Sequence, residues 1–412
     1  MSPCKSAESV RFVEQAGVVR NQRKTVFAVL LLVAVANAQL HEYEPGTGIL
    51  LLWPSARSIS LAGAMTGLAD ETDATFFNPA GLAFRNRIGF NLNYGNYLPG
   101  LYPGMHYANG SFATPVRSRL GPFHNLNLGA DVTWLYLGET EVINERGEYL
   151  GRHSVWRAVA GICAGVLVRP NLGVGIGLKL LRIRTFISDY WELWIVQDDG
   201  GNATTVSGDL SLLWRSSDWL SVGAALSNLG PRISYRYWSR QDMSAASQPT
   251  TVRLGLSLTP IRTGLLRLTV LPEVTDVLPS AIRPWEEPKP WCLQNELNGL
   301  WKSLGVELSI SDIVSLRAGY FEDLVRDRGG VVVERNGMYH HISLWEFFTR
   351  KRLGSFKRIG VCWGFGLGYQ DMVRLDVSND GAIYDWPESN WRLSLVCNDP
   401  VGLLGRLRGL TD

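Results

Sequence analysis

A histidine and a serine stand two positions apart at His341 and Ser343, a spacing that could support nucleophilic catalysis. On a strand, residues two apart face the same side, so the imidazole could take the proton from the serine hydroxyl. Such a pair also needs a carboxylate or amide to orient the histidine, and the sequence assigns none. The pair falls in a long loop between predicted strands. No catalytic site is therefore predicted, and the chain is not expected to be an enzyme.

Two glycine runs, at residues 173–177 and 364–368, have the Gly-x-Gly-x-Gly spacing that phosphate-binding loops can show. A phosphate loop requires a strand that turns directly into a helix. Here the glycines alternate at period two with large apolar residues, which places them inside strands. We interpret them as positions where one face of a sheet must stay free of side chains.

Composition argues against several other kinds of chemistry. After loss of an N-terminal signal, four cysteines remain, at Cys163, Cys292, Cys362 and Cys397. They lack the CxxC spacing of zinc sites, so neither a metal site nor a cofactor is predicted. The net charge of +2 at pH 7 excludes a strong general affinity for nucleic acid.

The first 38 residues have the pattern of a secretory signal peptide. Arg20, Arg23 and Lys24 precede an apolar run at 26–35, and Ala-Asn-Ala then supplies a signal-peptidase site. The apolar run is too short for a transmembrane helix, which needs about 20 residues. We predict cleavage after Ala38 and export from the cytoplasm, after an unusually long basic region at the start of the signal.

The chain after residue 87 alternates large apolar residues with small or polar ones. In the segment 88–95, Ile, Phe, Leu and Tyr alternate with Gly and Asn, and the segments 126–136, 174–180 and 361–369 behave alike. The 43 glycines beside 15 Trp, 14 Tyr and 14 Phe also favour β-structure. A sandwich needs large residues on its inner face, whereas a membrane barrel turns them to lipid. Trp134, Trp363, Phe365 and Tyr369 are therefore predicted to face lipid.

The alternating segments predict a transmembrane antiparallel β-barrel of fourteen strands. These are expected at 88–97, 105–116, 126–137, 155–168, 173–185, 203–214, 219–228, 251–259, 266–275, 303–309, 313–321, 358–369, 372–378 and 391–397. Connections after even-numbered strands are short and most of those after odd-numbered strands are long, as in outer-membrane barrels with periplasmic turns and external loops. The predicted organisation is a signal peptide at 1–38, an N-terminal plug at 39–87, a barrel at 88–397 and a basic tail at 398–412.

The plug contains a turn element at Asn78, Pro79, Ala80, Gly81 and Leu82. Asn-Pro turns the chain, and glycine permits a backbone approach that larger side chains would block. With Arg57, the small residues at 62–64 and the acidic residues at 70–73, this stretch resembles the entry segment of the PorV/PorQ family, within the wider FadL-like superfamily of outer-membrane barrels. The resemblance implies a helical plug packed on the barrel wall.

The same resemblance implies location in the bacterial outer membrane, with lipid as a partner. It implies a component of type IX-like protein secretion, which binds exported cargo proteins and other secretion components. A FadL-like passive channel for small hydrophobic molecules, with the plug as a movable hatch, is the alternative. A structural barrel without a transport role is the third interpretation.

Inward-facing positions of the predicted strands carry both signs of charge. They are Asn91, Asn93, Asp131, Lys179, Asp209, Glu307, Arg317, Arg374, Asp376 and Arg392. This mixture favours a hydrated or ion-paired lumen and argues slightly against a hydrophobic channel of the kind that transports fatty acids.

The long loops at 229–250, 276–302 and 322–357 are rich in aromatic residues. These include Tyr235, Tyr237, Trp238, Trp285, Trp291, Trp345 and Phe347. Because aromatic side chains dominate protein interfaces, we predict that these loops bind a partner. Alternatively they pack on one another above the barrel or lie at the lipid interface.

Overall fold

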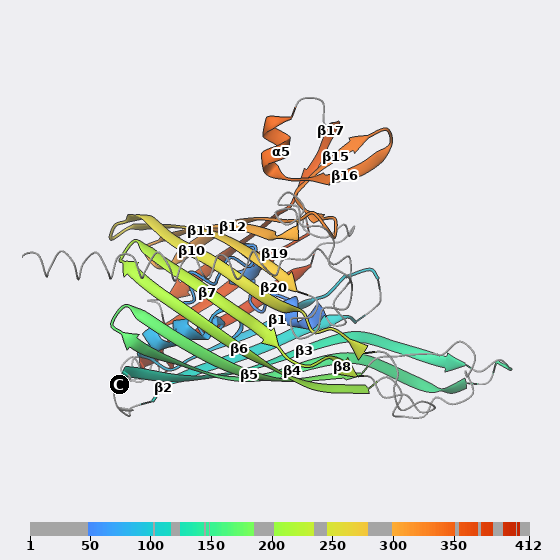
Figure 1. Cartoon of the computed structure of the whole chain (residues 1–412), viewed down its shortest axis with the longest axis horizontal. Coiled ribbons are helices and arrows are strands. Elements are labelled where there is room, and N and C mark those ends of the chain that lie inside the picture. Colours follow the sequence, from blue (N-terminus) through green and yellow to red (C-terminus); the bar gives the residue numbers. More distant parts are fainter. Residues whose placement is uncertain are drawn as a thin grey trace, which may run out of the picture.

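The computed structural model describes residues 48–101, 104–116, 124–143, 146–147, 149–184, 202–234, 245–278, 299–350, 354–369, 372–381, 390–400 and 402–403. Within them, fourteen antiparallel strands close into a barrel through the β1–β20 and β12–β13 pairings (Figure 1). The strands are β1 Gly89–Asn96, β2 His106–Pro115, β3 His124–Ile143, β4 Tyr149–Arg169, β5 Leu172–Arg184, β6 Asn202–Ser217, β7 Leu220–Leu229, β10 Thr250–Arg262, β11 Leu266–Leu278, β12 Trp301–Ile310, β13 Val314–Asp323, β18 Val361–Tyr369, β19 Val373–Asn379 and β20 Trp391–Cys397. The predicted barrel is confirmed.

The strands turn most of their large apolar residues outward and most of their small or polar residues inward. In β5, Leu178 and Leu180 are 65% and 49% exposed, whereas Lys179 between them is 5% exposed. A strand in water would not display such residues, but in a membrane this face contacts hydrocarbon. Trp363, Phe365 and Tyr369 lie on the exposed face of β18, and Trp134 stacks on Trp156 with 4.8 Å between ring centroids.

Three of the predicted strands need correction. Strands β3 and β4 extend about six residues beyond the predicted ends, because Glu139 pairs with Ser154 and Glu141 with Arg152 in a hairpin that continues past the barrel. The predicted strand 358–369 is broken at Gly360. A Cβ on this glycine would lie 2.4 Å from the Cα of Gly329, so the backbone at the break packs directly against Gly329.

The plug, here residues 48–87, lies inside the barrel (Figure 1). It consists of η1 (Gly48–Leu51), α2 (Ala56–Ser60), α3 (Ala74–Phe77) and η2 (Pro79–Phe84). No helix in the described part of the chain is long and apolar enough to cross a membrane. Almost every plug residue from 54 to 83 is buried, so the hydrophobic core lies between the plug and the inner wall of the barrel.

The loop predicted at 322–357 contains folded structure of its own. After β14 (Arg328–Gly329), a three-stranded sheet forms from β15 (Val331–Arg335), β16 (Met338–Ile342) and β17 (Ser355–Ile359), with helix α5 (Leu344–Thr349) beside it. We call residues 331–359 the outer subdomain. Figure 1 shows it standing off the outside of the barrel wall. A second short ribbon pairs β8 (Ile233–Ser234) with β9 (Ala245–Ala246).

Candidate functional site

One side of the plug contacts a wall of glycines. Pro79 begins η2, and Asn78 fixes its start by donating from Nδ2 to the Thr66 carbonyl at 2.8 Å while its Oδ1 accepts from the Ala80 amide at 3.2 Å. Gly173 and Gly175, in the first of the two runs that resembled a phosphate loop, face this turn. A Cβ on Gly175 would lie 2.2 Å from the amide nitrogen of Ala80. These glycines therefore let two backbones touch.

Similar backbone contacts surround this one. A Cβ on Gly165 would lie 2.5 Å from the Pro79 carbonyl oxygen, and one on Gly223 would lie 1.9 Å from that of Thr66. Within the plug itself, a Cβ on Gly81 would lie 2.1 Å from the Ala69 carbonyl oxygen. Asn78, Pro79, Ala80, Gly81 and Leu82 are all buried at this contact. The structure thus places the predicted turn element inside the lumen, against strands β4 to β7.

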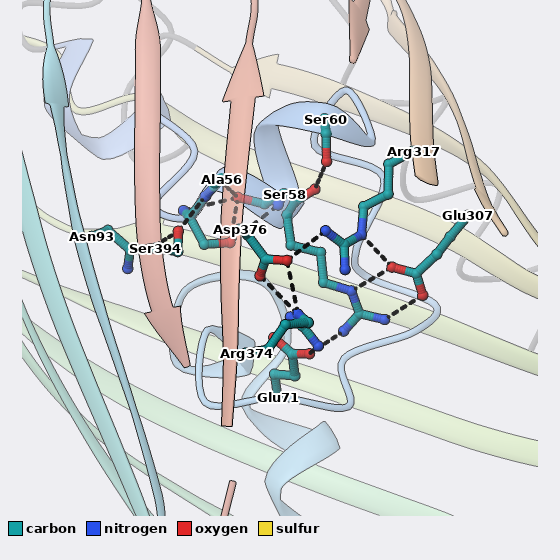
Figure 2. Close-up of polar contacts among 12 residues, drawn as sticks. Ala56, Ser58, Ser60, Glu71, Asn93, Glu307, Arg317, Arg374, Asp376 and Ser394 are labelled. Atoms are coloured by element: carbon teal, nitrogen blue, oxygen red, sulfur yellow. Dashed lines mark hydrogen bonds and ion pairs between the residues drawn. The ribbon is translucent and has the colours of Figure 1, made fainter. Parts of the chain in front are cut away.

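The other side of the plug is held by a closed cycle of alternating charges, which we call the ion-pair ring. It consists of Arg57, Glu307, Arg317, Asp376, Arg374 and Glu71 (Figure 2). Arg57 and Glu71 belong to the plug, whereas the other four belong to β12, β13 and β19 of the wall. The ring therefore connects residues up to about three hundred positions apart and carries no net charge.

The distances within the ring are those of direct ion pairs. Arg57 binds Glu307 in a bidentate manner, with Nε to Oε2 at 2.9 Å and Nη2 to Oε1 at 2.8 Å. Arg317 lies 2.5 Å from Glu307 and 2.7 Å from Asp376. Arg374 then closes the ring with contacts of 2.8 Å to Asp376 and 2.7 Å to Glu71. Since these groups are shielded from water, a partner lost from the ring would leave a costly buried charge.

The pKa values of two plug carboxyls, Glu71 of the ring and Asp73 beside it, are shifted in opposite directions. Burial pushes the pKa of Glu71 up, but the guanidinium groups of Arg374 and Arg57 outweigh it and bring that pKa to about 2. Burial, with the negative charge of Glu71, raises the pKa of Asp73 to about 7. Asp73 Oδ2 accepts a hydrogen bond from Ser55 Oγ at 2.8 Å. Glu71 is therefore charged throughout the neutral range, whereas Asp73 titrates near neutral pH.

The remaining predicted lumen residues form smaller polar clusters. Lys179 contacts Asp209 at 2.8 Å and donates to Asn228 Oδ1 at 2.9 Å. Asn93 accepts from the Ser394 hydroxyl, which in turn accepts from the Ala56 amide of the plug at 2.7 Å. Arg392 donates to the carbonyls of residues 53 and 54. Asn91 and Asp131 are buried inward-facing residues of β1 and β3. The structure places all ten predicted residues inside the barrel.

The lumen becomes apolar toward the end with the long loops. Ile49 and Leu50 of η1 pack in one cluster with wall residues that continue the inward rows of Asp131 and Lys179. This apolar luminal cluster consists of Ile49, Leu50, Tyr107, Leu135, Val159, Leu181, Ile183, Ala203 and Ile233. Our prediction of charged lumen residues omitted it, although the period-two pattern continues from Lys179 to Leu181 and Ile183. The lumen is therefore charged at mid-height and apolar above.

A polar cavity of about 390 Å³ lies at the opposite end, by the short turns. Its lining includes Arg57, Glu71 and Arg374 of the ring, together with Arg85, Arg87, Arg215 and Arg267. Arg215 stacks over the Phe84 ring, with its Cζ 4.1 Å from the ring centroid. On this side the ion-pair ring is therefore the layer that separates the cavity from the packed lumen.

The other predicted site residues lie elsewhere. Ser343 caps α5, because its Oγ accepts from the Glu346 amide at 3.0 Å, and His341 Nδ1 lies 2.8 Å from the Gly329 carbonyl oxygen. Trp345 and Phe347 belong to α5 in the outer subdomain. Tyr235, Tyr237, Trp238, Trp285 and Trp291 lie outside the described residues. Among those described, no group of three or more His, Cys, Asp or Glu side chains is arranged to hold a metal.

The closed barrel, its apolar outer face and its internal plug define an outer-membrane β-barrel with a plug inside the lumen. No protein-family model and no curated protein matches the chain. Among solved structures, the toluene transporter TbuX of Ralstonia pickettii is 12% identical over 83% of this chain and 96% of that one, with a TM-score of 0.45. The toluene transporter TodX of Pseudomonas putida is 13% identical over 84% of this chain and 97% of that one, with a TM-score of 0.44. A Pseudomonas aeruginosa FadL homologue is 11% identical over 84% of this chain and 98% of that one, with a TM-score of 0.42. Membership of the PorV/PorQ family stays a prediction.

Proposed function

We propose that this protein is a gated passive channel for small hydrophobic molecules in the bacterial outer membrane, with the plug as its movable hatch. The observation that carries the proposal is the apolar luminal cluster. Its residues come from several strands and pack on η1. A water-filled pore would have polar side chains at these positions instead. An apolar solute that replaces Ile49 and Leu50 against this wall keeps apolar surface away from water, at about 25 cal/mol per Å².

The arrangement of charges supports a plug that can move. If Arg57 and Glu71 left the ring, Glu307, Arg317, Asp376 and Arg374 would remain paired with one another on the wall. Arg57 would likewise keep Asp70 and Glu71, each 2.7 Å away. Every charged group in each half therefore keeps an oppositely charged partner, and separation avoids the large penalty of an isolated buried charge. The ion pairs between plug and wall therefore fix the position of the plug, but the free-energy cost of breaking them to release the plug stays moderate.

A reversible cross-link between plug and wall tests the proposal. The hydroxyl oxygens of Thr72 in the plug and Ser111 in β2 are 2.8 Å apart. Cysteines at both positions should form a disulfide across this contact. In liposomes, we expect the oxidised double variant to block toluene flux almost completely and dithiothreitol to restore it. The single variant Ser111→Cys controls for the change in side chain, and arabinose controls for leakage.

Two outcomes would contradict the channel. Equal toluene flux through the oxidised and reduced double variant would show that the plug does not gate the barrel. Flux no faster than in empty liposomes, even for the unmodified protein, would show that the lumen does not conduct hydrophobic solutes.

A second proposal, a component of protein secretion, is supported by the exposed aromatic side chains of the outer subdomain. Trp345 and Phe348 are 78% and 75% exposed on one short helix. If they anchor cargo, Trp345→Ser with Phe348→Ser should abolish capture of a cargo C-terminal domain by the purified barrel. Trp219→Ser, which removes an exposed tryptophan near a short turn, is the matched control. Unchanged capture in the double variant would argue against this role.

A further inference from the structure

The outer subdomain presents a surface that is both aromatic and basic. Its most exposed large apolar side chains are Met338, Tyr339, Trp345, Phe348 and Phe356, between 54% and 78% exposed. Over residues 331–359 the sequence has six Lys or Arg against two Glu, a net charge of +4, whereas the whole chain has only +2. Helix α5 buries none of its residues. Nothing in the subdomain itself requires this much exposed aromatic surface.

The subdomain is nevertheless folded and firmly attached. Val331, Val332 and Val333 of β15 are buried between its neighbours β16 and β17. At the base, the Gly360 amide donates to the Gly330 carbonyl at 2.7 Å, and the Gly330 amide donates to the Phe321 carbonyl at 2.8 Å. These bonds tie the subdomain to the end of β13. Its orientation relative to the barrel is thus set by a short hydrogen-bonded neck and not by a long linker.

That orientation places the subdomain beside the lipid-facing wall. Figure 1 shows it projecting sideways from the barrel. β17 continues through Gly360 into β18, so exposed Phe356 is followed along the chain by Val361 and Trp363 of the lipid-contacting face. Trp363 packs edge-to-face on Trp391 with 5.5 Å between ring centroids. Aromatic pairs of this kind mark the membrane interface in outer-membrane barrels.

We propose that the outer subdomain docks on the outer leaflet of the membrane that surrounds the barrel. Trp345, Phe348 and Phe356 would insert at the boundary between headgroups and acyl chains. Arg350 and Lys357 would contact the phosphates of anionic lipid there. Their present partners, Glu346 and Glu334, are also at the surface, so exchange of these exposed pairs for lipid phosphate costs little. Continuity with the lipid-facing wall and the basic charge favour lipid over a protein partner.

Depth measurements by electron paramagnetic resonance test this docking on the full-length protein. A nitroxide is attached at Phe348→Cys, and a second sample carries it at Tyr149→Cys, an exposed residue of the β3–β4 hairpin. The unmodified chain gives the background from native cysteines. In bilayers containing lipid A, we expect the label at 348 to be more accessible to oxygen than to a nickel chelate. The label at 149 should show the reverse.

Charge variants separate lipid A phosphate from acyl chains as the source of docking. Each Lys or Arg beside an anionic surface changes the docked-to-free ratio about fivefold. Arg350→Ser with Lys357→Ser should therefore lower that ratio about twenty-five-fold in lipid A bilayers. It should have little effect in phosphatidylcholine bilayers. An equal effect in both bilayers would overturn the assignment of Arg350 and Lys357 to lipid phosphate.

Two further results would overturn the docking itself. One is a label at 348 that is as accessible to the nickel chelate as the label at 149 in both kinds of bilayer. The other is a label at 348 that stays exposed in bilayers but becomes protected when a secreted cargo domain is added, since this would assign the surface to a protein partner. Neither result depends on solute flux, so failure of this inference is distinguishable from failure of the channel proposal.

Discussion

The plug meets the wall in two different ways on opposite sides of the lumen. On one side, η2 touches strands β4 to β7 through glycines, with backbone against backbone. Three to seven strands away around the barrel, α2 and the following segment meet β12, β13 and β19 through the ion-pair ring. Glycines also meet the plug backbone here, because a Cβ on Gly319 would lie 2.5 Å from the Ala62 amide nitrogen. Backbone contact through glycine leaves little room for displacement on either side, but only the α2 side also has the ion-pair ring, whose members can exchange partners. We therefore expect the η2 side to act as a hinge and the α2 side to move.

The largest expected effect comes from removing a ring member that belongs to the wall. In Arg317→Met, Asp376 keeps only Arg374 as a partner and Glu307 keeps only Arg57. The ring then has three carboxylates and two guanidinium groups, so one buried negative charge is in excess. Removal of one partner from a buried pair typically costs about 3–5 kcal/mol. We expect a loss of that size in the free energy of unfolding, measured by guanidinium titration in phospholipid vesicles.

The matched variant Arg57→Met distinguishes a movable plug from a merely structural one. It leaves every charged wall residue of the ring with a wall partner, since Glu307 still contacts Arg317, while Asp70 is partly exposed to solvent. We expect a smaller loss of stability, about 1–3 kcal/mol, but faster toluene flux. A loss equal to that of Arg317→Met, with unchanged flux, would contradict the division of the ring into a fixed and a movable part.

A smaller effect is expected on the glycine side. Gly175→Ala places a Cβ 2.2 Å from the Ala80 amide nitrogen, so plug or wall must shift. Such overpacking typically costs about 1–3 kcal/mol. Gly208→Ala is the control, because a Cβ there has no neighbour closer than 3.7 Å. The melting temperature from heat-modified gel mobility should fall for Gly175→Ala only; equal values for both variants would show that η2 does not touch the wall.

The same comparison shows what a sequence can and cannot predict here. The wall could be predicted, because a membrane barrel imposes an outward apolar and inward polar or small residue at every second position. This rule identified Glu307, Arg317 and Asp376 as inward-facing, and it explains why glycines recur at period two in β5. The lipid-facing positions of β18 follow from the same rule.

The pairing across the lumen could not be predicted. Arg57 and Glu307 are 250 positions apart, and their contact depends on how far the plug enters the closed barrel. The outer subdomain was also missed. Its strand β15 begins with three consecutive valines, and such a run lacks the alternation by which the barrel strands were recognised. A local pattern therefore predicts which way a side chain points, but not its partner.

The smallest expected effect concerns pH, because Asp73 accepts a hydrogen bond from Ser55 at the start of α2, the part of the plug that we propose moves. In the closed barrel its pKa is raised to about 7, against an ordinary value of 3.8 for a hydrated carboxyl in a released plug. Between these two values the closed state binds one proton more than the open state. The closed state is thus weakened as pH rises from about 4 to about 7, by up to about tenfold per unit, and the effect levels off above 7. Glu71, with a pKa of about 2, does not contribute over this range.

We therefore expect toluene flux to rise between pH 5 and pH 7 and then to stay constant up to pH 8. Asp73→Asn should remove most of this dependence, because an amide cannot titrate, while its flux at pH 5 should resemble that of the unmodified protein. The oxidised Thr72→Cys/Ser111→Cys variant should show no flux at any pH, which separates gating from a change in solute partitioning. If Asp73→Asn keeps the full rise between pH 5 and pH 7, another group controls the hatch, and Asp73 only stabilises α3 through its contact with Ser55.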